Sequence, residues 1–430
     1  MNAQVRIVAA TLMLASLPLV ASATGIASSG PLPHGGSYVL QPDTTVATSS
    51  VALWFRAPGN GYDGANPGIA RLAATAAAAA TLESGKSLVT LVRSLGGSLT
   101  IDVYPDIVGV TVVAPAPVTR RIVAAMSGAY FSPSIDETSL QVAKKDVAVL
   151  AVERRYSSDD LLHDALFAQI FSGGPAHAAP LPDAMKELTQ IPLADVVSFA
   201  KRAFRSANAT LTLAGNVDAS TLDAVTAGAT GTADAPLDSP LAPGATAATS
   251  LTALVGGVGI AWSGPPIRDE RAATALDFVS DYLFRNGSGV VARAVDRDDT
   301  YVNGQFITLH NPGVMLVTIG GSDADVVQTH VLDAVRSLQT PLDAATFAAA
   351  REAFLYRLAA DAQTPSEQTD NLGWYASEGD ASYAPSDLQG SYWKIAQSLD
   401  PAYVASVVKQ YLGRPVIVHL TATSAKESNS

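Results

Sequence analysis

The feature of this sequence that most constrains its fold is an internal repeat. Two segments of the chain each contain an amphipathic helix followed by an apolar strand. The two strands are at 209–214 and 415–422. The helices share a pattern of apolar, small polar and basic residues, which is Val196, Ser198, Lys201 and Phe204 in the first and Val404, Ser406, Lys409 and Leu412 in the second. Each pair is 208 residues apart (404 − 196 = 208), which indicates a duplication. Chance similarity between two amphipathic helices is the alternative explanation.

A change of composition separates the two copies. Residues 228–250 are rich in Ala, Thr, Gly and Pro, contain three prolines and hold no aromatic side chain, as is typical of an inter-domain linker. A chain of 430 residues with 48% hydrophobic residues can bury a core in each of two domains. We therefore predict an N-terminal domain at 24–227, a linker at 228–250, a C-terminal domain at 251–425 and a tail at 426–430.

The first 23 residues have the pattern of a secretory signal peptide. Arg6 precedes an apolar run at 7–20, and Ala21-Ser22-Ala23 offers the small residues of a cleavage site. An uncleaved anchor helix is the alternative, but the run is shorter than the ~20 residues that span a bilayer. No later stretch reaches that length without a charge or a turn, so we expect an exported protein, periplasmic or secreted, with no membrane span after signal cleavage.

The charge balance argues against nucleic acid as a partner. The chain has 27 Lys and Arg against 39 Asp and Glu, a net charge of −12, whereas binding to a phosphate backbone needs clustered basic residues. There is no Cys, so the chain has no thiol for disulfide, redox or nucleophilic chemistry.

Hydrophobic patterning predicts the same order of elements in both halves. The first half reads as a strand at 50–57, helices beginning at 67 and 86, strands at 98–103 and 107–114, and helices at 117–130, 137–156 and 160–171. The second half reads as a strand at 251–262, a helix at 270–284, strands at 301–309 and 314–320, and helices beginning at Asp323, Leu342, Ser366 and Ser386. Helices gathered on one face of a mostly antiparallel sheet make each half an α+β domain.

The first helix and the segments after it resemble the pitrilysin/insulinase-type metallopeptidases, or inverzincins. The helix begins with Pro67-Gly68-Ile69-Ala70-Arg71-Leu72-Ala73-Ala74-Thr75, and Gly96-Gly97, two alternating strands and Gly215-Asn216-Val217 follow it. The resemblance covers nearly the whole chain after the signal peptide, because that family is built from duplicated α+β domains with a linker. Its processing-peptidase-like branch, which includes mitochondrial processing peptidase and the core subunits of the respiratory cytochrome bc complex, is the branch that we favour.

The resemblance implies a zinc site that this chain has lost. Active members carry H-x-x-E-H on this helix, where two His residues bind Zn²⁺ and the Glu acts as general base. The matching positions are Arg71, Ala74 and Thr75, which offer no imidazole and no carboxylate. We therefore expect a catalytically inactive protein that binds no metal and uses no cofactor.

Glu153 stands where the resemblance places the third zinc ligand. As a vestigial ligand it would bind metal too weakly to matter. As a structural residue it would pair with Arg71, so that an ion pair replaces the metal, and we favour this interpretation over a solvated Glu153. Further along, Asp160, His163 and Asp164 share one helical face, which could hold a cation but is more typical of a solvated surface.

The resemblance also implies that the second half contributes an Arg and a Tyr to the binding of a peptide substrate. Tyr301 matches the Tyr, Arg293 is the nearest Arg to the expected place, and Arg297 lies between them. A forked guanidinium and a phenol suit a peptide carbonyl or carboxylate. In the alternative, Tyr301 packs at a strand start and both arginines balance nearby aspartates.

We therefore expect the non-catalytic subunit of an exported peptidase. It would form a heterodimer with an active pitrilysin-type relative that carries H-x-x-E-H, and the two chains would enclose a peptide substrate. A stand-alone binding or scaffold protein on the same fold is the alternative from another class. The sequence has no G-x-S-x-G and no H-E-x-x-H, so nothing in it points to an enzyme with a different site.

Overall fold

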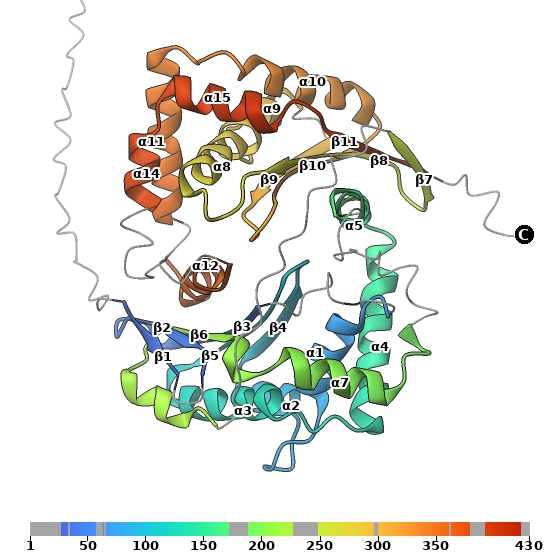
Figure 1. The fold of residues 1–430 in the computed structure, drawn as a ribbon, viewed down its shortest axis with the longest axis vertical. Helices are drawn as coiled ribbons and strands as arrows, with labels where there is room; N and C mark the ends of the chain where they lie inside the picture. The colour runs from blue at the N-terminus through green and yellow to red at the C-terminus, as the bar shows by residue number, and fades with distance from the viewer. Residues whose placement is uncertain are drawn as a thin grey trace, which may run out of the picture.

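The protein folds into two halves whose β-sheets face each other (Figure 1). The computed structural model describes residues 27–32, 35–56, 63, 66–171, 188–226, 248–295, 300–360, 363–378 and 392–422. The expected signal peptide, most of the expected linker, the start of the helix expected from Ser386 and the expected tail at 426–430 lie outside these residues. Within the described ranges, no helix combines the length and the apolar character needed to cross a bilayer.

The first half is built on a six-stranded sheet. Its strands are β1 (Ser28–Pro31), β2 (Ser37–Pro42), β3 (Thr48–Arg56), β4 (Ser98–Val103), β5 (Ile107–Pro115) and β6 (Ala209–Gly215). Its helices are α1 (Ile69–Ala79), α2 (Leu88–Ser94), α3 (Thr119–Phe131), α4 (Glu137–Arg154), α5 (Ser158–Ile170) and α7 (Leu193–Ala203). The strand order is β1-β2-β6-β3-β5-β4, and every neighbouring pair is antiparallel except β2 with β6.

The second half is built on a five-stranded sheet. Its strands are β7 (Thr249–Ala253), β8 (Gly257–Gly264), β9 (Thr300–Ile307), β10 (Gly313–Gly321) and β11 (Val416–Ala422). Its helices are α8 (Glu270–Phe284), α9 (Val290–Ala294), α10 (Ala324–Ser337), α11 (Ala344–Ala360), α12 (Pro365–Glu378), α14 (Trp393–Ser398) and α15 (Pro401–Tyr411). The single strand expected at 251–262 is therefore two strands, β7 and β8.

The two sheets share one topology. The order β2-β6-β3-β5-β4 in the first half corresponds to β7-β11-β8-β10-β9 in the second, and in both the first pair is parallel while the others are antiparallel. The predicted class, two matching α+β domains with mostly antiparallel sheets, is confirmed. β11 lies between β7 and β8, so these two strands are not neighbours.

Helix α1 lies at the centre of the first half. Its small side chains let other helices approach closely, and α1 packs against α4 and α7. The buried residues include Ala70, Ala73, Ala74 and Ala77. The helix begins after Gly68, whose φ of 85° suits a residue without a Cβ.

The two halves exchange one helix each. Helix α5 of the first half packs on β8, β10 and β11, whereas α12 of the second half packs on β3, β5 and β6 (Figure 1). Glycines permit both approaches: a Cβ on Gly259 would lie 2.8 Å from Leu166, and one on Gly373 would lie 2.0 Å from Nε1 of Trp54. Each sheet is thus covered by helices of its own half on one face and by a helix of the other half on the opposite face.

Candidate functional site

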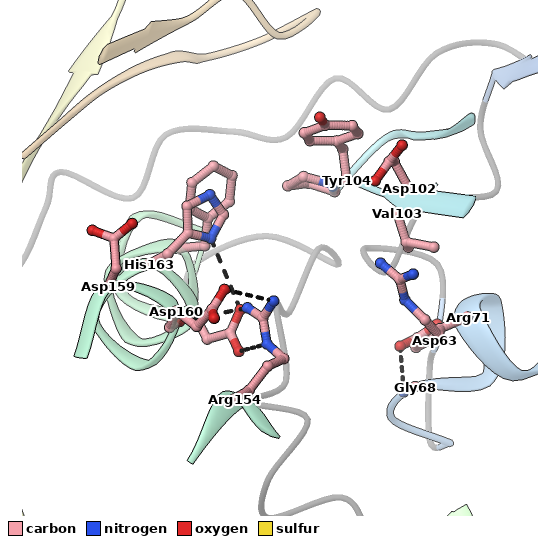
Figure 2. Close-up of a pocket in the computed structure, with 13 residues that line it drawn as sticks. Asp63, Gly68, Arg71, Asp102, Val103, Tyr104, Arg154, Asp159, Asp160 and His163 are labelled. Carbon is pink, nitrogen blue, oxygen red and sulfur yellow. Dashed lines mark hydrogen bonds and ion pairs between the residues drawn. The ribbon is translucent and has the colours of Figure 1, made fainter. Parts of the chain in front are cut away.

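A small pocket, which we call the Arg71 pocket, surrounds the place where the resemblance puts the zinc site. It has a volume of about 210 Å³ and gathers side chains from α1, the end of β4, the end of α4 and one face of α5 (Figure 2). The charged and polar residues that line it include Asp63, Arg71, Asp102, Tyr104, Arg154, Asp160, His163 and Asp164. Two guanidinium groups and several carboxylates therefore share a space that the resemblance reserves for a metal.

Arg71 is bound to the neighbouring strand and not to Glu153. Its Nη1 donates to the backbone carbonyl of Ile101 at 2.6 Å. Burial lowers the pKa of Arg71, and the nearby Asp102 carboxylate opposes that change. Glu153 is exposed, and in the described part of the chain no ion pair joins it to Arg71. The predicted ion pair is therefore wrong, because the last turn of α4 directs Arg154 toward the pocket.

Arg154 connects α4 to the charged face of α5. Its Nη1 lies 2.9 Å from Oδ1 of Asp160, and its Nη2 lies 2.7 Å from Oδ1 of Asp164. His163 stacks on Phe167 with ring centroids 4.4 Å apart. The predicted acidic side of α5 is thus paired with a guanidinium of the same chain and not with a bound cation. This side of α5 forms part of the pocket wall.

Ala74 and Thr75 present no group that could bind a metal or move a proton. The Ala74 side chain is fully buried, and its carbonyl accepts a hydrogen bond from Oη of Tyr130 at 3.0 Å. The Thr75 hydroxyl donates back to the Arg71 carbonyl at 2.9 Å. Within the described residues no three His, Asp or Glu side chains gather in a way that could hold a metal ion. Two guanidinium groups also repel a divalent cation, so the residues present do not fit zinc.

Asp63 fixes the start of α1 and so the position of Arg71. Its two carboxylate oxygens accept hydrogen bonds from the backbone N–H groups of Gly68 at 2.6 Å and Ala70 at 2.9 Å. The side chain is buried, and burial raises the pKa of Asp63 to about 7. Our sequence interpretation did not single out this residue. The sequence feature that could have identified Asp63 is its position: it is an acidic residue a few positions before a helix whose N-cap residue, Gly68, has no side chain to cap the helix.

The two residues predicted to bind a peptide are not brought together. Oη of Tyr301 lies 2.9 Å from Oγ of Ser158, so Tyr301 joins the start of β9 to the start of α5. Arg293 is exposed on α9, with no described contact to Tyr301, and Arg297 lies outside the described residues. Neither Tyr301 nor Arg293 lines the Arg71 pocket.

A second space, which we call the inter-half pocket, adjoins the Arg71 pocket. It has a volume of about 620 Å³ and shares Asp159 and His163 with the Arg71 pocket. Its other walls come from α8, β9 and β10 of the second half, including Asp281 and Asn303. Asp159 accepts hydrogen bonds from Thr318 and, at 3.4 Å, from Asn303. The sequence alone did not reveal this pocket, because its walls come from both halves.

Solved structures share this fold. A protease from Helicobacter pylori matches with a TM-score of 0.77 and 16% identity, over 92% of this chain and 99% of that one. An M16 peptidase inactive domain from Pseudomonas fluorescens matches with a TM-score of 0.76 and 17% identity, over 93% and 99%. A chain of complex III2 from Candida albicans matches with a TM-score of 0.75 and 15% identity, over 92% and 96%.

These similarities concern the fold alone, because the identities are low. No family model matches the sequence, and no curated protein matches it. The solved structures extend over nearly the whole of both chains, so the match includes both halves and their arrangement. The chain thus has the two-half α+β fold of M16-like peptidases, the fold that its resemblance to pitrilysin-type enzymes predicts.

Proposed function

We propose that this chain is the non-catalytic subunit of an exported, two-chain zinc-peptidase-like complex of the processing-peptidase type. It would pair with a relative that carries H-x-x-E-H and would help to enclose and position a peptide. The observation that carries the proposal is Arg71, on the helix where active members hold zinc, with its guanidinium bonded to the Ile101 carbonyl. In a subunit that has lost the metal, we expect a side chain with a structural role in place of a metal ligand, as Arg71 is here.

The electrostatics of the Arg71 pocket support the loss of catalysis. A peptidase of this kind needs a metal-bound water and a base beside it. Here Arg154 neutralises Asp160 and Asp164, and Asp63 is engaged with two backbone N–H groups. The other two acidic lining residues are engaged as well, since Asp102 lies near Arg71 and Asp159 accepts hydrogen bonds from Thr318 and Asn303, which argues against a free base at the pocket centre.

An exposed apolar stripe on α4 supports a protein partner. Val142, Val149 and Val152 are exposed on this helix, and Tyr156 follows its last turn. The spacing between Val142, Val149 and Tyr156 is seven residues, which places them along one side of the helix. Lys145 and Asp146 are exposed between Val142 and Val149, so the stripe mixes apolar and charged side chains, and we propose it as the surface that the partner covers.

Mixing experiments test the proposal. The purified chain would be combined with its H-x-x-E-H relative, and peptide cleavage and the size-exclusion profile would be measured for each mixture. We expect cleavage well above that of the relative alone, because the second chain completes the enclosure and orients the substrate. Tyr301→Phe in the same mixture tests whether the Tyr301 hydroxyl contributes to peptide positioning, a role that stays a prediction, as does that of Arg293.

A matched pair of variants locates the partner surface. Val149→Asp should weaken the complex because it places a charge in the apolar stripe, whereas Val326→Asp, at an exposed Val on α10, should not. A relative that is fully active alone would exclude the proposed subunit role and favour a stand-alone binding or scaffold protein. Equal behaviour of the two variants would place the partner on another surface.

A further inference from the structure

The second half has a pocket at the place that corresponds to the Arg71 pocket. This aromatic pocket, of about 610 Å³, is lined by one face of α12 that consists of Gln368, Asn371, Leu372 and Tyr375. Each lies 208 residues after a residue of α5 that lines the Arg71 pocket, in the order Asp160, His163, Asp164 and Phe167. The internal repeat therefore gives both halves a pocket in the same position, although neither the fold nor the proposed function assigns a role to the second one.

Differences at the repeated positions explain why the aromatic pocket is larger than the Arg71 pocket. In the first half, Arg154 fills space by pairing with Asp160 and Asp164. The corresponding residues of α12 are Gln368 and Leu372, which carry no charge to attract a guanidinium. Arg357, in the last turn of α11, instead pairs with Asp281 on α8 at 2.5 Å.

Aromatic rings form much of the wall. Trp374 and Tyr375 come from α12, and Tyr392 and Trp393 come from the start of α14. Two of these rings have polar atoms that are bonded within the protein: Nε1 of Trp374 donates to the Thr308 carbonyl at 2.8 Å, and the Tyr392 hydroxyl bonds Asp277. Burial holds the pKa of Tyr392 well above its usual value, so the ring stays neutral. The aromatic side chains, together with Leu358 and Leu372, therefore give the pocket an apolar, ring-rich wall, which favours contact with another aromatic ring.

The charge balance of the aromatic pocket does not favour an ion. Among the described lining residues, Asp277 and Arg357 carry the charges, and their opposite signs cancel at a separation of 3.9 Å. The other polar lining residues include Gln41, Gln368 and Asn371, whose side chains are uncharged amides. Gln41 belongs to β2, so the first half also contributes to this pocket.

We infer that the aromatic pocket binds an uncharged aromatic side chain of a peptide. The inter-half pocket shares Asp277 and Arg357 with the aromatic pocket, and Asp159 and His163 with the Arg71 pocket, so the three spaces adjoin. The aromatic pocket therefore lies next to the space between the halves, where the proposed peptide would bind. That the ligand is a peptide rests on the proposed function, whereas the preference for an aromatic ring rests on this pocket alone.

Direct titration of the full chain tests the inference without any partner. The probes are acetyl-Ala-Ala-Phe-Ala-Ala-amide and the same peptide with Leu or Ala at the centre, and binding is followed by ligand-observed NMR. We expect the Phe peptide to bind about tenfold or more tightly than the Ala peptide, because the ring is removed from water, with the Leu peptide between them. Equal binding of the three peptides would overturn the inference, and so would binding of a methyl glucoside in preference to the Phe peptide.

Variants that fill the pocket provide the second arm. Ala359→Trp on α11 and Asn371→Trp on α12 each add an indole from a different wall, at exposed positions where folding should be preserved. Ala348→Trp, at an exposed position of α11 that lines none of the three pockets, is the matched control.

Circular dichroism identifies which filling variants are folded, and one folded variant is sufficient. We expect at least about a tenfold loss of Phe-peptide binding in it and no change in Ala348→Trp. Unchanged binding in a folded filling variant would overturn the assignment. Because the partner is absent, failure here leaves the cleavage test of the proposed function unaffected.

Discussion

At the scale of single residues, the charge of Arg71 explains its contacts. A guanidinium does not lose its proton in proteins, so a partly buried Arg needs acceptors around it. Ile101 supplies a carbonyl, and Asp102 supplies a carboxylate nearby, while burial raises the pKa of that carboxyl. Arg71 thus ties α1 to the end of β4 and makes a mechanical link where an active member would have a metal.

The first prediction compares Arg71 with Glu153. Arg71→Leu should lower the free energy of unfolding by about 1.5 to 3 kcal/mol, because a charge-assisted hydrogen bond is lost and Asp102 loses its neighbour. Glu153→Gln should change it by less than about 0.5 kcal/mol, because Glu153 is exposed. Urea denaturation of both variants measures the difference. Equal losses would show that the two residues act as a pair after all.

The second prediction concerns Asp63, whose pKa rises from 3.8 to about 7 on folding. The folded state therefore holds this proton more tightly than the unfolded state, and stability falls as pH rises from 3.8 to about 7. The pKa difference corresponds to a loss of stability of about 4 kcal/mol, and this loss is complete only above pH 7.

Asp63→Asn removes this titration. The stability advantage of the wild type over the variant should therefore be larger at pH 5 than at pH 8, as measured by urea denaturation at both values. The exposed Asp333→Asn should keep the pH dependence of the wild type and serves as control. An advantage that is the same at both pH values would contradict the assignment to Asp63.

At the scale of elements, close packing decides how α12 lies on the first sheet. Trp374 of α12 meets Trp54 of β3 edge to face, with ring centroids 5.9 Å apart. Thr369 and Ser50 share a buried hydrogen bond of 2.7 Å between their hydroxyls. Gly373 sits directly over Trp54 and Thr212, so this contact has no space for a side chain.

The third prediction follows from Gly373. Gly373→Ala should destabilise the protein by about 1 to 3 kcal/mol, because its Cβ would overlap Trp54 and Thr212 and push α12 from the sheet. Gly128→Ala in α3 is the matched control, since a Cβ there meets nothing within 4 Å and should stabilise the helix by about 0.5 to 1 kcal/mol. Thermal unfolding measures both. A neutral Gly373→Ala would mean that α12 can shift on the sheet without cost.

Elements with strong periodicity and clear ends were predictable from the sequence. β4 and α8 have the bounds that the pattern predicts, because Gly96-Gly97 and Asp269 mark their starts. β1 and β2 were missed, since they are short and lie among Gly and Pro residues.

The site was less predictable than the elements. Neighbouring residues on a helix point about 100° apart, so only the structure shows that Arg154 and not Glu153 faces the Arg71 pocket. The aromatic pocket depends on how α12 meets α11 and α14, and no local pattern encodes that arrangement.

At the scale of the whole molecule, the two exchanged helices join the halves. Helix α12 is bonded to the first sheet through Thr369, and α5 is bonded to the second through Ser158 and Asp159. Removing either half leaves one face of the remaining sheet exposed to water. The halves should therefore unfold together.

The fourth prediction tests this coupling. Calorimetry of the full chain should show one transition, with equal calorimetric and van't Hoff enthalpies. Residues 27–226 and 248–422 expressed separately should each bind a hydrophobic dye and melt at lower temperature, because each lacks the helix that covers one face of its sheet. Mixing the two pieces should restore the melting temperature toward that of the intact chain. Two separate transitions in the full chain would contradict it.

The exchange of α5 and α12 also has a consequence for ancestry. A chain of half this length, with the same helix and sheet, would leave one face of its sheet exposed. Its exchanged helix would have no sheet of the same chain to pack against. Two such chains could form a domain-swapped dimer around a two-fold axis, in which the helix of each chain packs on the exposed sheet face of the other. Joining two such chains end to end gives the topology seen here. After the fusion the two copies could diverge, so that charged residues line one pocket and aromatic residues line the other.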